Sequence, residues 1–191
     1  MRFVAVVKED CPTCRLAVPA LAEMRAGGLT LDVLTQDEPA FPRGLAPRHD
    51  GDLAESHRLR IEIVPTLIAY DDAGAETARV YGWNKQEWRG ISGLNGLAGS
   101  LPENMPGCGA LNVAPGMVER LALQAGEIKL AARQIPVAED ADPIEVAYDR
   151  GWSDGLPVVP PTDLRVARML AGTTRAPDEV IGLVPPNLIP C

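Results

Sequence analysis

The chain has 191 residues, of which 46% are hydrophobic and 4% aromatic, so it can bury a mainly aliphatic core. Its formal net charge of -8 disfavours nucleic-acid binding, which depends on attraction to phosphate, and adhesion to an anionic membrane. No stretch approaches the ~20 apolar residues of a membrane-spanning helix. We therefore expect a globular protein that binds neither nucleic acid nor membrane.

The beginning of the chain does not have the pattern of a secretory signal. The apolar run at residues 3–7 is too short, and no small-residue cleavage site follows it. We therefore expect a cytoplasmic location. In that compartment, a close pair such as Cys11 and Cys14 is more often catalytic or metal-binding than structural.

The first predicted elements are a strand and a helix that meet at the two cysteines. Residues 3–7 are apolar and rich in β-branched side chains, which predicts a buried strand. A Cys-Pro-Thr-Cys motif occupies residues 11–14, and apolar residues then recur at helical spacing until the glycines at 27–28. The cysteines are therefore predicted at the start of a helix that follows a strand.

Five further elements are predicted before residue 98. They are a strand at 29–35, a short helix at 52–59, a strand at 61–70 interrupted by Pro65, a strand at 77–81 and a helix at 84–97. A turn at 71–74 joins the last two strands into a hairpin. This order predicts an α/β fold: a mixed four-stranded sheet flanked by helices, with a parallel first pair and an antiparallel hairpin.

Beyond Gly99 the chain becomes richer in Pro and Gly. We expect residues 1–99 to form the first domain and 100–143 a linker with one helix at about 117–132. Residues 144–191 are predicted to open a second, partly helical domain that the chain cuts short, with a helix from about Asp163 to Leu170 capped by Thr162. The apolar run at 188–191, which lacks a closing helix, fits this interpretation.

Two thiols three positions apart at a helix start can exchange disulfides. The first faces free backbone N–H groups and the positive end of the helix dipole, which favour its thiolate. Cys11 is therefore predicted to attack a substrate disulfide, and Cys14 to resolve the mixed disulfide that forms. Pro12 suits the first helical turn, where its missing N–H would have no helical partner.

Two questions about this pair stay open at this point. The acidic residues Glu9 and Asp10 would raise the pKa of Cys11, whereas Lys8 and Arg15 would lower it, so the sign of the net shift is not fixed. The alternative role is half of a metal site, whose other ligands would come from Cys108, Cys191, His49 and His57. None of these belongs to a second paired motif, so we expect no metal.

Several motifs in residues 1–97 resemble the thioredoxin-like superfamily. Cys11-Pro12-Thr13-Cys14 with Pro19 is similar to its active-site helix, and Ile63-Val64-Pro65-Thr66 to its cis-proline strand. The resemblance implies a cis bond before Pro65, which packs against the cysteines, and backbone groups of Val64 that pair with an extended substrate. We accordingly expect the substrate to contact Val64, Pro65, Pro12 and Thr13.

The chain departs from that family at two positions and in length. Asp10 stands where the family usually has Trp, and Ala5 where it has a buried acid that accepts the proton of the resolving thiol. The extra first strand and helix of full thioredoxins are absent, so the expected domain is closer to the minimal, glutaredoxin-like core.

Three further features have two interpretations each. Cys108 is either a third redox thiol that exchanges with Cys11 or an incidental cysteine in a Gly/Pro loop. Trp83 and Trp88 either rim a substrate groove or, as we expect, pack amphipathically at the surface. Residues 144–191, through Gly-Trp-Ser-Asp-Gly at 151–155, weakly resemble the start of the UGSC (seleno)proteins; otherwise they are a proline-rich tail.

The function we expect is that of a thiol–disulfide oxidoreductase that cycles Cys11 and Cys14 and needs no metal or organic cofactor. Its partners would be a disulfide-containing protein or a small thiol substrate, together with an external reductant or oxidant. The alternative is a redox-sensing or soft-metal-binding module that serves an attached C-terminal domain. A structural domain with inert thiols is the third hypothesis.

Overall fold

The computed structural model describes residues 1–156, 158–176, 179–187 and 189–190. Its contacts divide the chain into two compact units, Met1–Leu121 and Ala122–Cys191. Within the described residues, no helix is long and apolar enough to cross a membrane.

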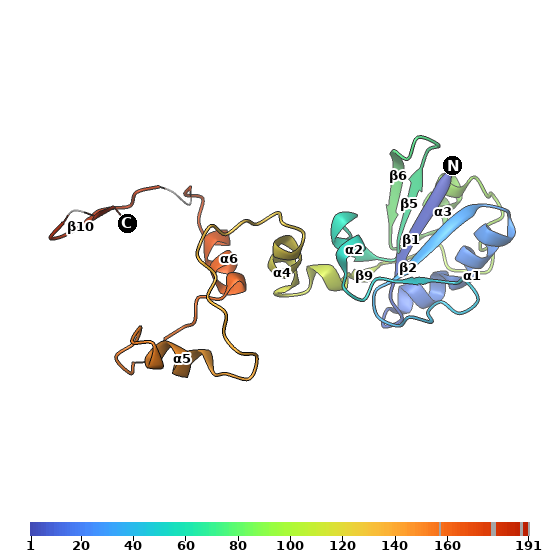
Figure 1. Ribbon diagram of the computed structural model, residues 1–191. Coiled ribbons are helices and arrows are strands. Elements are labelled where there is room, and N and C mark those ends of the chain that lie inside the picture. The colour runs from blue at the N-terminus through green and yellow to red at the C-terminus, as the bar shows by residue number, and fades with distance from the viewer. Residues whose placement is uncertain (157, 177–178, 188, 191) are drawn as a thin grey trace. The chain divides into compact units, whose positions relative to one another are not determined.

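A mixed five-stranded sheet forms the centre of the first unit, in the order β3-β2-β1-β5-β6 (Figure 1). Its strands are β1 Arg2–Val7, β2 Thr30–Thr35, β3 Arg48–His49, β5 Thr66–Tyr70 and β6 Glu76–Tyr81. Strand β2 is parallel to its neighbours β1 and β3, whereas β5 is antiparallel to β1 and to β6. The mixed sheet was predicted with four strands; β3 is the fifth, and two residues are too few for an alternating pattern.

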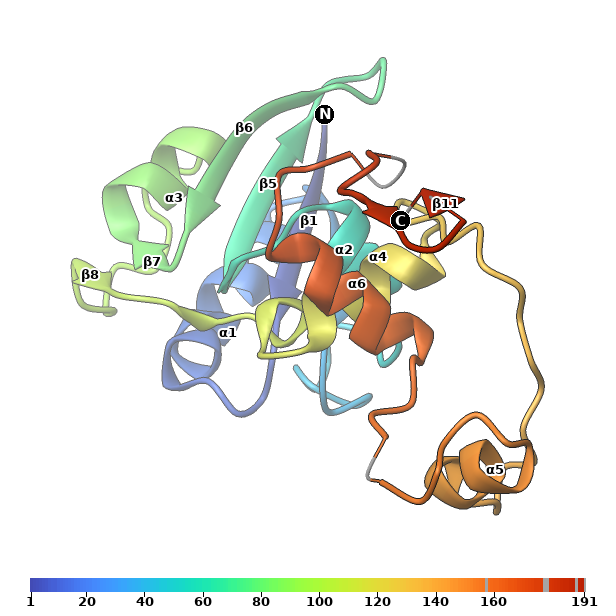
Figure 2. The same cartoon turned by 90° about the vertical axis from the view of Figure 1, so that its left-hand side faces the viewer.

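Helices cover both faces of this sheet. They are α1 Pro12–Ala26, α2 Ala54–Arg58 and α3 Lys85–Ser92. Figure 2 shows α1 and α3 on one side of the strands and α2 on the other. The carboxylate of Glu23 in α1 accepts a hydrogen bond of 2.7 Å from the backbone N–H of Ala98, which ties α1 to the loop that follows α3.

The two tryptophans belong to the core, which corrects the prediction of surface packing. Trp83 and Trp88 are 1% and 0% exposed, and their ring centroids lie 5.0 Å apart. Their indole N–H groups donate to the carbonyl oxygens of Pro102 at 2.8 Å and Gly82 at 3.0 Å. Because α3 packs directly against the sheet, the ring of Trp88 faces inward, and its polar atom is satisfied by backbone rather than water.

The predicted strand at 61–70 divides at Pro65 into β4, Ile63–Val64, and β5. The Val64–Pro65 peptide bond is cis. Strand β5 stays in the central sheet, but β4 pairs with β9, Cys108–Gly109, in an antiparallel ribbon. A second ribbon joins β7, Trp83–Asn84, to β8, Asn104–Met105.

Because of these two ribbons, the first unit extends beyond residue 99. Residues 100–121 belong to the first unit, because backbone groups of β4 and β7 have their partners in β9 and β8. The division lies between Leu121 and Ala122, whereas the sequence placed it after residue 99 and assigned 100–143 to a linker. Two-residue strands within a Pro/Gly-rich segment give no periodic signal.

A buried polar network fixes the next turn of the chain, the 3₁₀-helix Leu111–Val113. The side-chain amide of Gln36 donates to Ser56 Oγ at 2.8 Å and to Asn112 Oδ1 at 3.0 Å. Asn112 Nδ2 in turn donates to the backbone carbonyl of Ile61 at 2.6 Å. All these side chains are buried, so the segment after β9 is held by satisfied hydrogen bonds.

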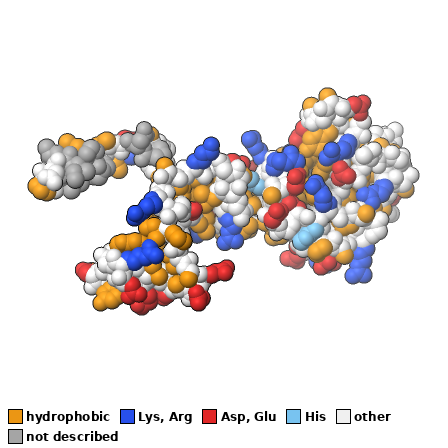
Figure 3. Space-filling model, in the orientation of Figure 1, with side chains coloured by type: hydrophobic (Ala, Val, Ile, Leu, Met, Phe, Trp, Pro, Cys, Tyr) orange, Lys and Arg blue, Asp and Glu red, His pale blue; other side chains and the backbone are white. Residues whose placement is uncertain are grey.

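The second unit contains short elements and few buried side chains. Helix α4, Met117–Gln124, spans the division between the units and ends earlier than the predicted residue 132. The other helices are α5, Pro143–Asp149, and α6, Asp163–Ala171. Strands β10, Leu183–Val184, and β11, Ile189–Pro190, pair antiparallel. Thr162 caps α6 as predicted, since its Oγ1 accepts from Arg165 N–H at 3.4 Å. Figure 3 shows hydrophobic side chains at the surface over α5, where Ile144, Tyr148 and Trp152 are exposed. Of the predicted apolar run at 188–191, residues 188 and 191 lie outside the described residues.

Candidate active site

The two cysteines lie at the start of α1, directly after the end of β1. Cys11 is the N-cap residue, with extended backbone angles, and Pro12 follows as the first helical residue. The Cys14 N–H donates to Cys11 Sγ at 3.4 Å, and the Lys8 N–H donates to Cys14 Sγ at 3.4 Å. Cys11 thus occupies the cap position, where the free N–H groups of the first turn stabilise negative charge.

The pKa values of the two thiols move in opposite directions. Burial raises the pKa of Cys11, but hydrogen bonds from the Cys108 thiol and from the backbone of Cys14 and Thr13 outweigh it, so the net pKa is lowered. Burial raises the pKa of Cys14 well above its ordinary value, and the charge of the neighbouring Cys11 raises it further. The site therefore holds one thiol that ionises easily and one that stays protonated.

Hydrogen bonds, rather than the flanking charges, set the direction for Cys11. The backbone N–H groups of Glu9 and Asp10 donate to the Asp37 carboxylate at 2.7 and 2.9 Å, and Arg15 Nε donates to the Glu9 carbonyl at 2.7 Å. These contacts order the loop between β1 and α1. The sequence left the sign of the shift open because thiol–thiol and backbone hydrogen bonds cannot be deduced from nearby charges.

Val64 lines the same site from another part of the chain. It is buried, and its carbonyl lies 3.6 Å from Cys11 Sγ. When Cys11 is protonated, its thiol donates to this carbonyl. The site therefore combines the helix start at Cys11 with the strand that ends at Val64.

Strand β9 already occupies the edge of β4 beside Cys11. Its register places Cys108 opposite Val64 and Gly109 opposite Ile63, and the Ala110 N–H donates to the Glu62 carbonyl at 2.9 Å. The Val64 backbone, expected to pair with an extended substrate, is thus paired with the chain's own strand. Cys108 Sγ lies 2.7 Å from Cys11 Sγ.

Thr13 and Lys8 also hold this strand. Thr13 Oγ1 donates to the Pro106 carbonyl at 2.5 Å, and Lys8 Nζ donates to the Gly109 carbonyl at 2.9 Å. Of the four residues predicted to contact substrate, Val64 and Thr13 contact residues 106–109 in this structure, and substrate contact by Val64, Pro65, Pro12 and Thr13 remains a prediction. The sequence suggested Cys108 as an exchange partner for Cys11 but gave no sign of the strand pairing.

Among the described residues, no group of three or more His, Cys, Asp or Glu side chains is arranged to hold a metal ion. Cys191, one of the alternative ligands, lies outside the residues that the structure describes.

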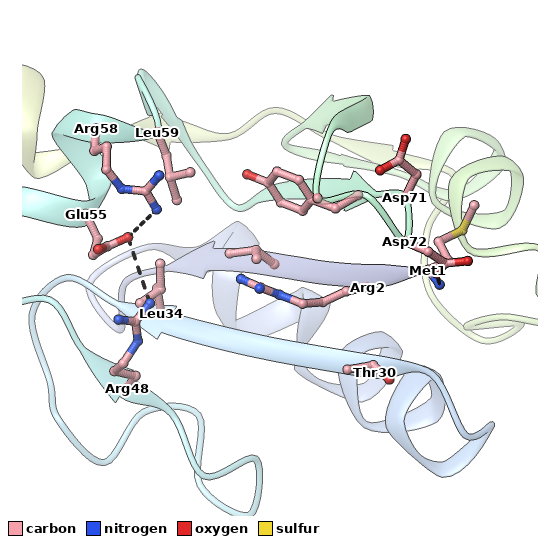
Figure 4. Close-up of a pocket in the computed structure, with 13 residues that line it drawn as sticks. Met1, Arg2, Thr30, Leu34, Arg48, Glu55, Arg58, Leu59, Asp71 and Asp72 are labelled. Atoms are coloured by element: carbon pink, nitrogen blue, oxygen red, sulfur yellow. Dashed lines mark hydrogen bonds and ion pairs between the residues drawn. The ribbon is translucent and has the colours of Figure 1, made fainter.

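A separate pocket of about 550 Å³ opens elsewhere on the first unit (Figure 4). Its lining includes Arg2, Arg48, Arg58 and Glu55, and no cysteine. The Glu55 carboxylate lies 2.6 Å from Arg58 and 3.9 Å from Arg48, as the dashed lines in Figure 4 mark. The single carboxylate of Glu55 therefore compensates one of the two guanidinium charges, and these three residues keep a net positive charge.

Comparison with known proteins gives little further information. No protein-family model matches the chain, and no curated protein matches it. A solved structure of a secreted disulfide oxidoreductase from Mycobacterium tuberculosis, described as homologous to E. coli DsbE, matches with 16% identity and a TM-score of 0.42, over 48% of this chain and 79% of that one. Neither value assigns a function to this chain. The resemblance of residues 144–191 to UGSC proteins has no support in these comparisons.

Proposed function

We propose that this protein is a thiol–disulfide oxidoreductase of the thioredoxin-like type. The Cys11 thiolate attacks one sulfur of a substrate disulfide, forms a mixed disulfide and releases the other sulfur as a thiolate. Cys14 then loses its proton and attacks Cys11 Sγ, which releases the second substrate thiolate and leaves a Cys11–Cys14 disulfide. An external dithiol reductant returns the pair to the reduced state, and the reverse sequence oxidises a substrate.

The observation that carries this proposal is the asymmetry of the pair. Cys11 is at the N-cap with a lowered pKa, and Cys14 is buried one helical turn away with a raised pKa. An attacking thiol has to be ionised near neutral pH, whereas a resolving thiol has to stay protonated until the mixed disulfide forms. Two inert buried thiols would both have raised pKa values.

The substrate class follows from the groups that flank Cys11. The pairing of Val64 with the extended strand β9 supports an extended peptide that carries a disulfide as the proposed substrate, which would take the place of β9. A small thiol or disulfide is the second candidate, because it needs no strand pairing. The chemistry requires no metal or organic cofactor.

The buried Ala5 is expected to make resolution slow. It is 0% exposed and stands where the resemblance predicts a proton-accepting acid. In the loop after β1, the Lys8 N–H donates a hydrogen bond to the Cys14 sulfur. A backbone N–H is a donor and cannot accept the proton of the Cys14 thiol. We therefore expect the mixed disulfide to persist longer than when a carboxylate serves Cys14.

A redox titration tests the proposal. Purified protein would be equilibrated in glutathione buffers of graded potential and its free thiols counted by alkylation and mass spectrometry, alongside Cys11→Ser and Cys14→Ser. We expect a two-electron transition whose product, identified by peptide mapping, is a Cys11–Cys14 disulfide, and neither variant can form that bond. Free Cys11 and Cys14 at every potential would refute the proposal.

The pH dependence of alkylation is a second test. Because the pKa of Cys11 is lowered, we expect its thiolate, and hence its alkylation rate in reduced protein, to develop at lower pH than for an ordinary cysteine, whose pKa is ~8.5. Cys14 should react only above that pH. Equal pH profiles for the two thiols would contradict the assigned roles.

A further inference from the structure

Three thiols, rather than two, meet at the active site. Cys11 and Cys14 come from α1, and Cys108 is added by β9, 97 positions along the chain from Cys11. The 2.7 Å between the sulfur atoms of Cys11 and Cys108 is about 0.7 Å longer than the ~2.05 Å of a disulfide bond. Small shifts of two side chains would therefore bring these sulfurs to bonding distance.

The backbone around Cys108 is placed like that of a bound peptide. Residues 108–109 extend the Val64 edge as an antiparallel strand, with Cys108 directly opposite Val64. Hydrogen bonds from Thr13 and Lys8 hold this strand on either side of Cys108, at the Pro106 and Gly109 carbonyls. A peptide disulfide attacked by Cys11 would need this geometry: strand pairing on one side and a sulfur against Cys11 on the other.

The close approach of β9 depends on a glycine. A Cβ at Gly107 would lie 2.2 Å from Ile63 Cγ2 and 2.7 Å from the Val64 carbonyl oxygen, whereas a Cβ at Gly109 would meet nothing within 4 Å. Beyond β9, Asn112 anchors the chain through Gln36 and Ile61. The chain is therefore held closely at Gly107, before β9, and anchored at Asn112, after it.

We propose that Cys108 is an internal disulfide partner of Cys11 and that residues 106–110 are a built-in substrate strand which closes the active site. This inference rests on the proposed function, since it uses Cys11 as the nucleophile. In the oxidised protein, Cys108 loses its proton and attacks Cys11 Sγ of the Cys11–Cys14 disulfide; the Cys11–Cys108 bond forms, and Cys14 leaves as a thiolate that takes up a proton. No net oxidation occurs in this step.

From the fully reduced protein, the same bond forms with a disulfide oxidant. Glutathione disulfide accepts two electrons and leaves as two glutathione thiols, while Cys11 and Cys108 lose their two protons. Cys108 also resolves a mixed disulfide between Cys11 and a small thiol by attack on Cys11 Sγ, which releases that thiol. Cys108 is partly exposed and Cys14 is fully buried, so Cys108 is the more accessible of the two resolving thiols.

The Cys14→Ser variant tests the bond directly. The full-length variant would be oxidised with glutathione disulfide, digested without reduction, and its cross-linked peptides identified by mass spectrometry. We expect a Cys11–Cys108 disulfide as the main product, lost in Cys14→Ser/Cys108→Ser, where Cys11 carries glutathione instead. Stable glutathione on Cys11 of the Cys14→Ser variant, with Cys108 free, would overturn the proposal.

A matched pair of glycine variants tests the closing strand. In reduced Gly107→Ala, the added methyl group should displace β9 and raise the alkylation rate of Cys11 by about tenfold, because access limits thiol reactivity. Gly109→Ala, with open space at its Cβ, should match the wild type. Equal rates in all three proteins, with circular dichroism confirming that each is folded, would refute a closing role for residues 106–110.

The proposed function and this inference fail in distinguishable ways. A Cys108→Ser variant that keeps the Cys11–Cys14 transition, together with a Cys14→Ser variant that forms no Cys11–Cys108 bond, removes only the internal partner. Loss of the Cys11–Cys14 transition from the wild type and from Cys108→Ser removes the proposed function. If Cys14→Ser does not fold, Cys14→Ala is the replacement, and disulfide mapping in partly oxidised wild type still reports whether the Cys11–Cys108 bond forms.

Discussion

The two units of this chain differ in whether their large hydrophobic side chains are buried. In Met1–Leu121, large side chains such as Phe3, Leu67 and Trp88 are buried in one cluster. In the described part of 122–191, the buried residues are three alanines, Ala122, Ala147 and Ala167, while Met169 is 80% exposed. A high apolar content therefore produces a core only where distant segments pair.

The first unit shows how that pairing arises. Strand β1 lies between β2 and β5, so residues 2–7 contact segments that begin at Thr30 and Thr66. In the second unit the recorded strand pair joins β10 to β11, which are close in sequence. A pair of short strands that are close in sequence brings few apolar side chains into contact. A sheet made from separate segments has a wide face that helices can cover, and that face is where apolar side chains are buried.

The largest effect on stability is expected when the chain is truncated within the first unit. A chain of residues 1–121 should unfold in urea with the same midpoint as the first unit of the full chain. The free energy of unfolding of residues 1–99 should be lower by several kcal/mol. In 1–99 the partners of β4 and β7 are missing, and Gln36 loses Asn112; a group that stays buried without a partner costs ~1–3 kcal/mol. Fluorescence of the buried Trp83 and Trp88 reports the transition. Equal midpoints for 1–99 and 1–121 would restore the boundary at residue 99.

A pair of large-to-small substitutions tests the contrast in burial. Leu67→Ala removes a fully buried side chain from the central sheet and should lower the free energy of unfolding by ~2–5 kcal/mol. Met169→Ala, at an exposed position of α6, should change it by less than ~0.5 kcal/mol. Urea unfolding of both variants measures the difference. A comparable loss for Met169→Ala would show that the second unit buries this residue in solution.

Substitution of Asn112 probes the polar anchor of the first unit. Asn112→Ala leaves the Gln36 amide and the Ile61 carbonyl without that partner, which should cost ~1–3 kcal/mol in free energy of unfolding. Val113→Ala, next in sequence and 39% exposed, is the matched control and should be close to neutral. Amide hydrogen exchange at residues 108–112 should accelerate in Asn112→Ala alone; unchanged exchange would mean that the network does not hold this segment.

The smallest effect is expected from surface ion pairs, one in each unit. Glu76→Gln removes the 2.8 Å ion pair with Arg79 and should lower the free energy of unfolding by at most ~1 kcal/mol. Glu179→Gln removes the more exposed pair with Arg175 and should be neutral.

The pH dependence of the Glu76 pair gives a further test. The hydrogen bond from Arg79 lowers the pKa of Glu76. The stabilisation is therefore present at neutral pH, above the ordinary carboxyl pKa, and is lost as the pH falls through the lowered value. The wild type and Glu76→Gln should have equal stability at low pH; a difference that persists there would exclude the charge as its cause.

Local patterns predicted the main elements of the first unit. Strand β1, the cysteines at the start of α1 and the β5–β6 hairpin were all predicted, because each depends on residues a few positions apart. Strand β3 and the ribbon strands β4, β7, β8 and β9 have two residues each, too few for a period. The burial of Trp88 was missed because the face of a short helix that packs inward depends on where the sheet lies, and that of Trp83 because the two-residue strand β7 has no periodic pattern.

The sequence by itself determined that Cys11 and Cys14 lie together at a helix start, because a Cys-x-x-Cys spacing between a strand and an apolar helical pattern depends on local geometry alone. The proposed disulfide exchange starts from that placement. Only the tertiary structure decided what lies beside them. Cys108 reaches Cys11 because β9 pairs with β4, and that contact spans 97 positions of chain. The direction of the Cys11 pKa depends on the same contact, since a hydrogen bond between distant residues exists only after folding.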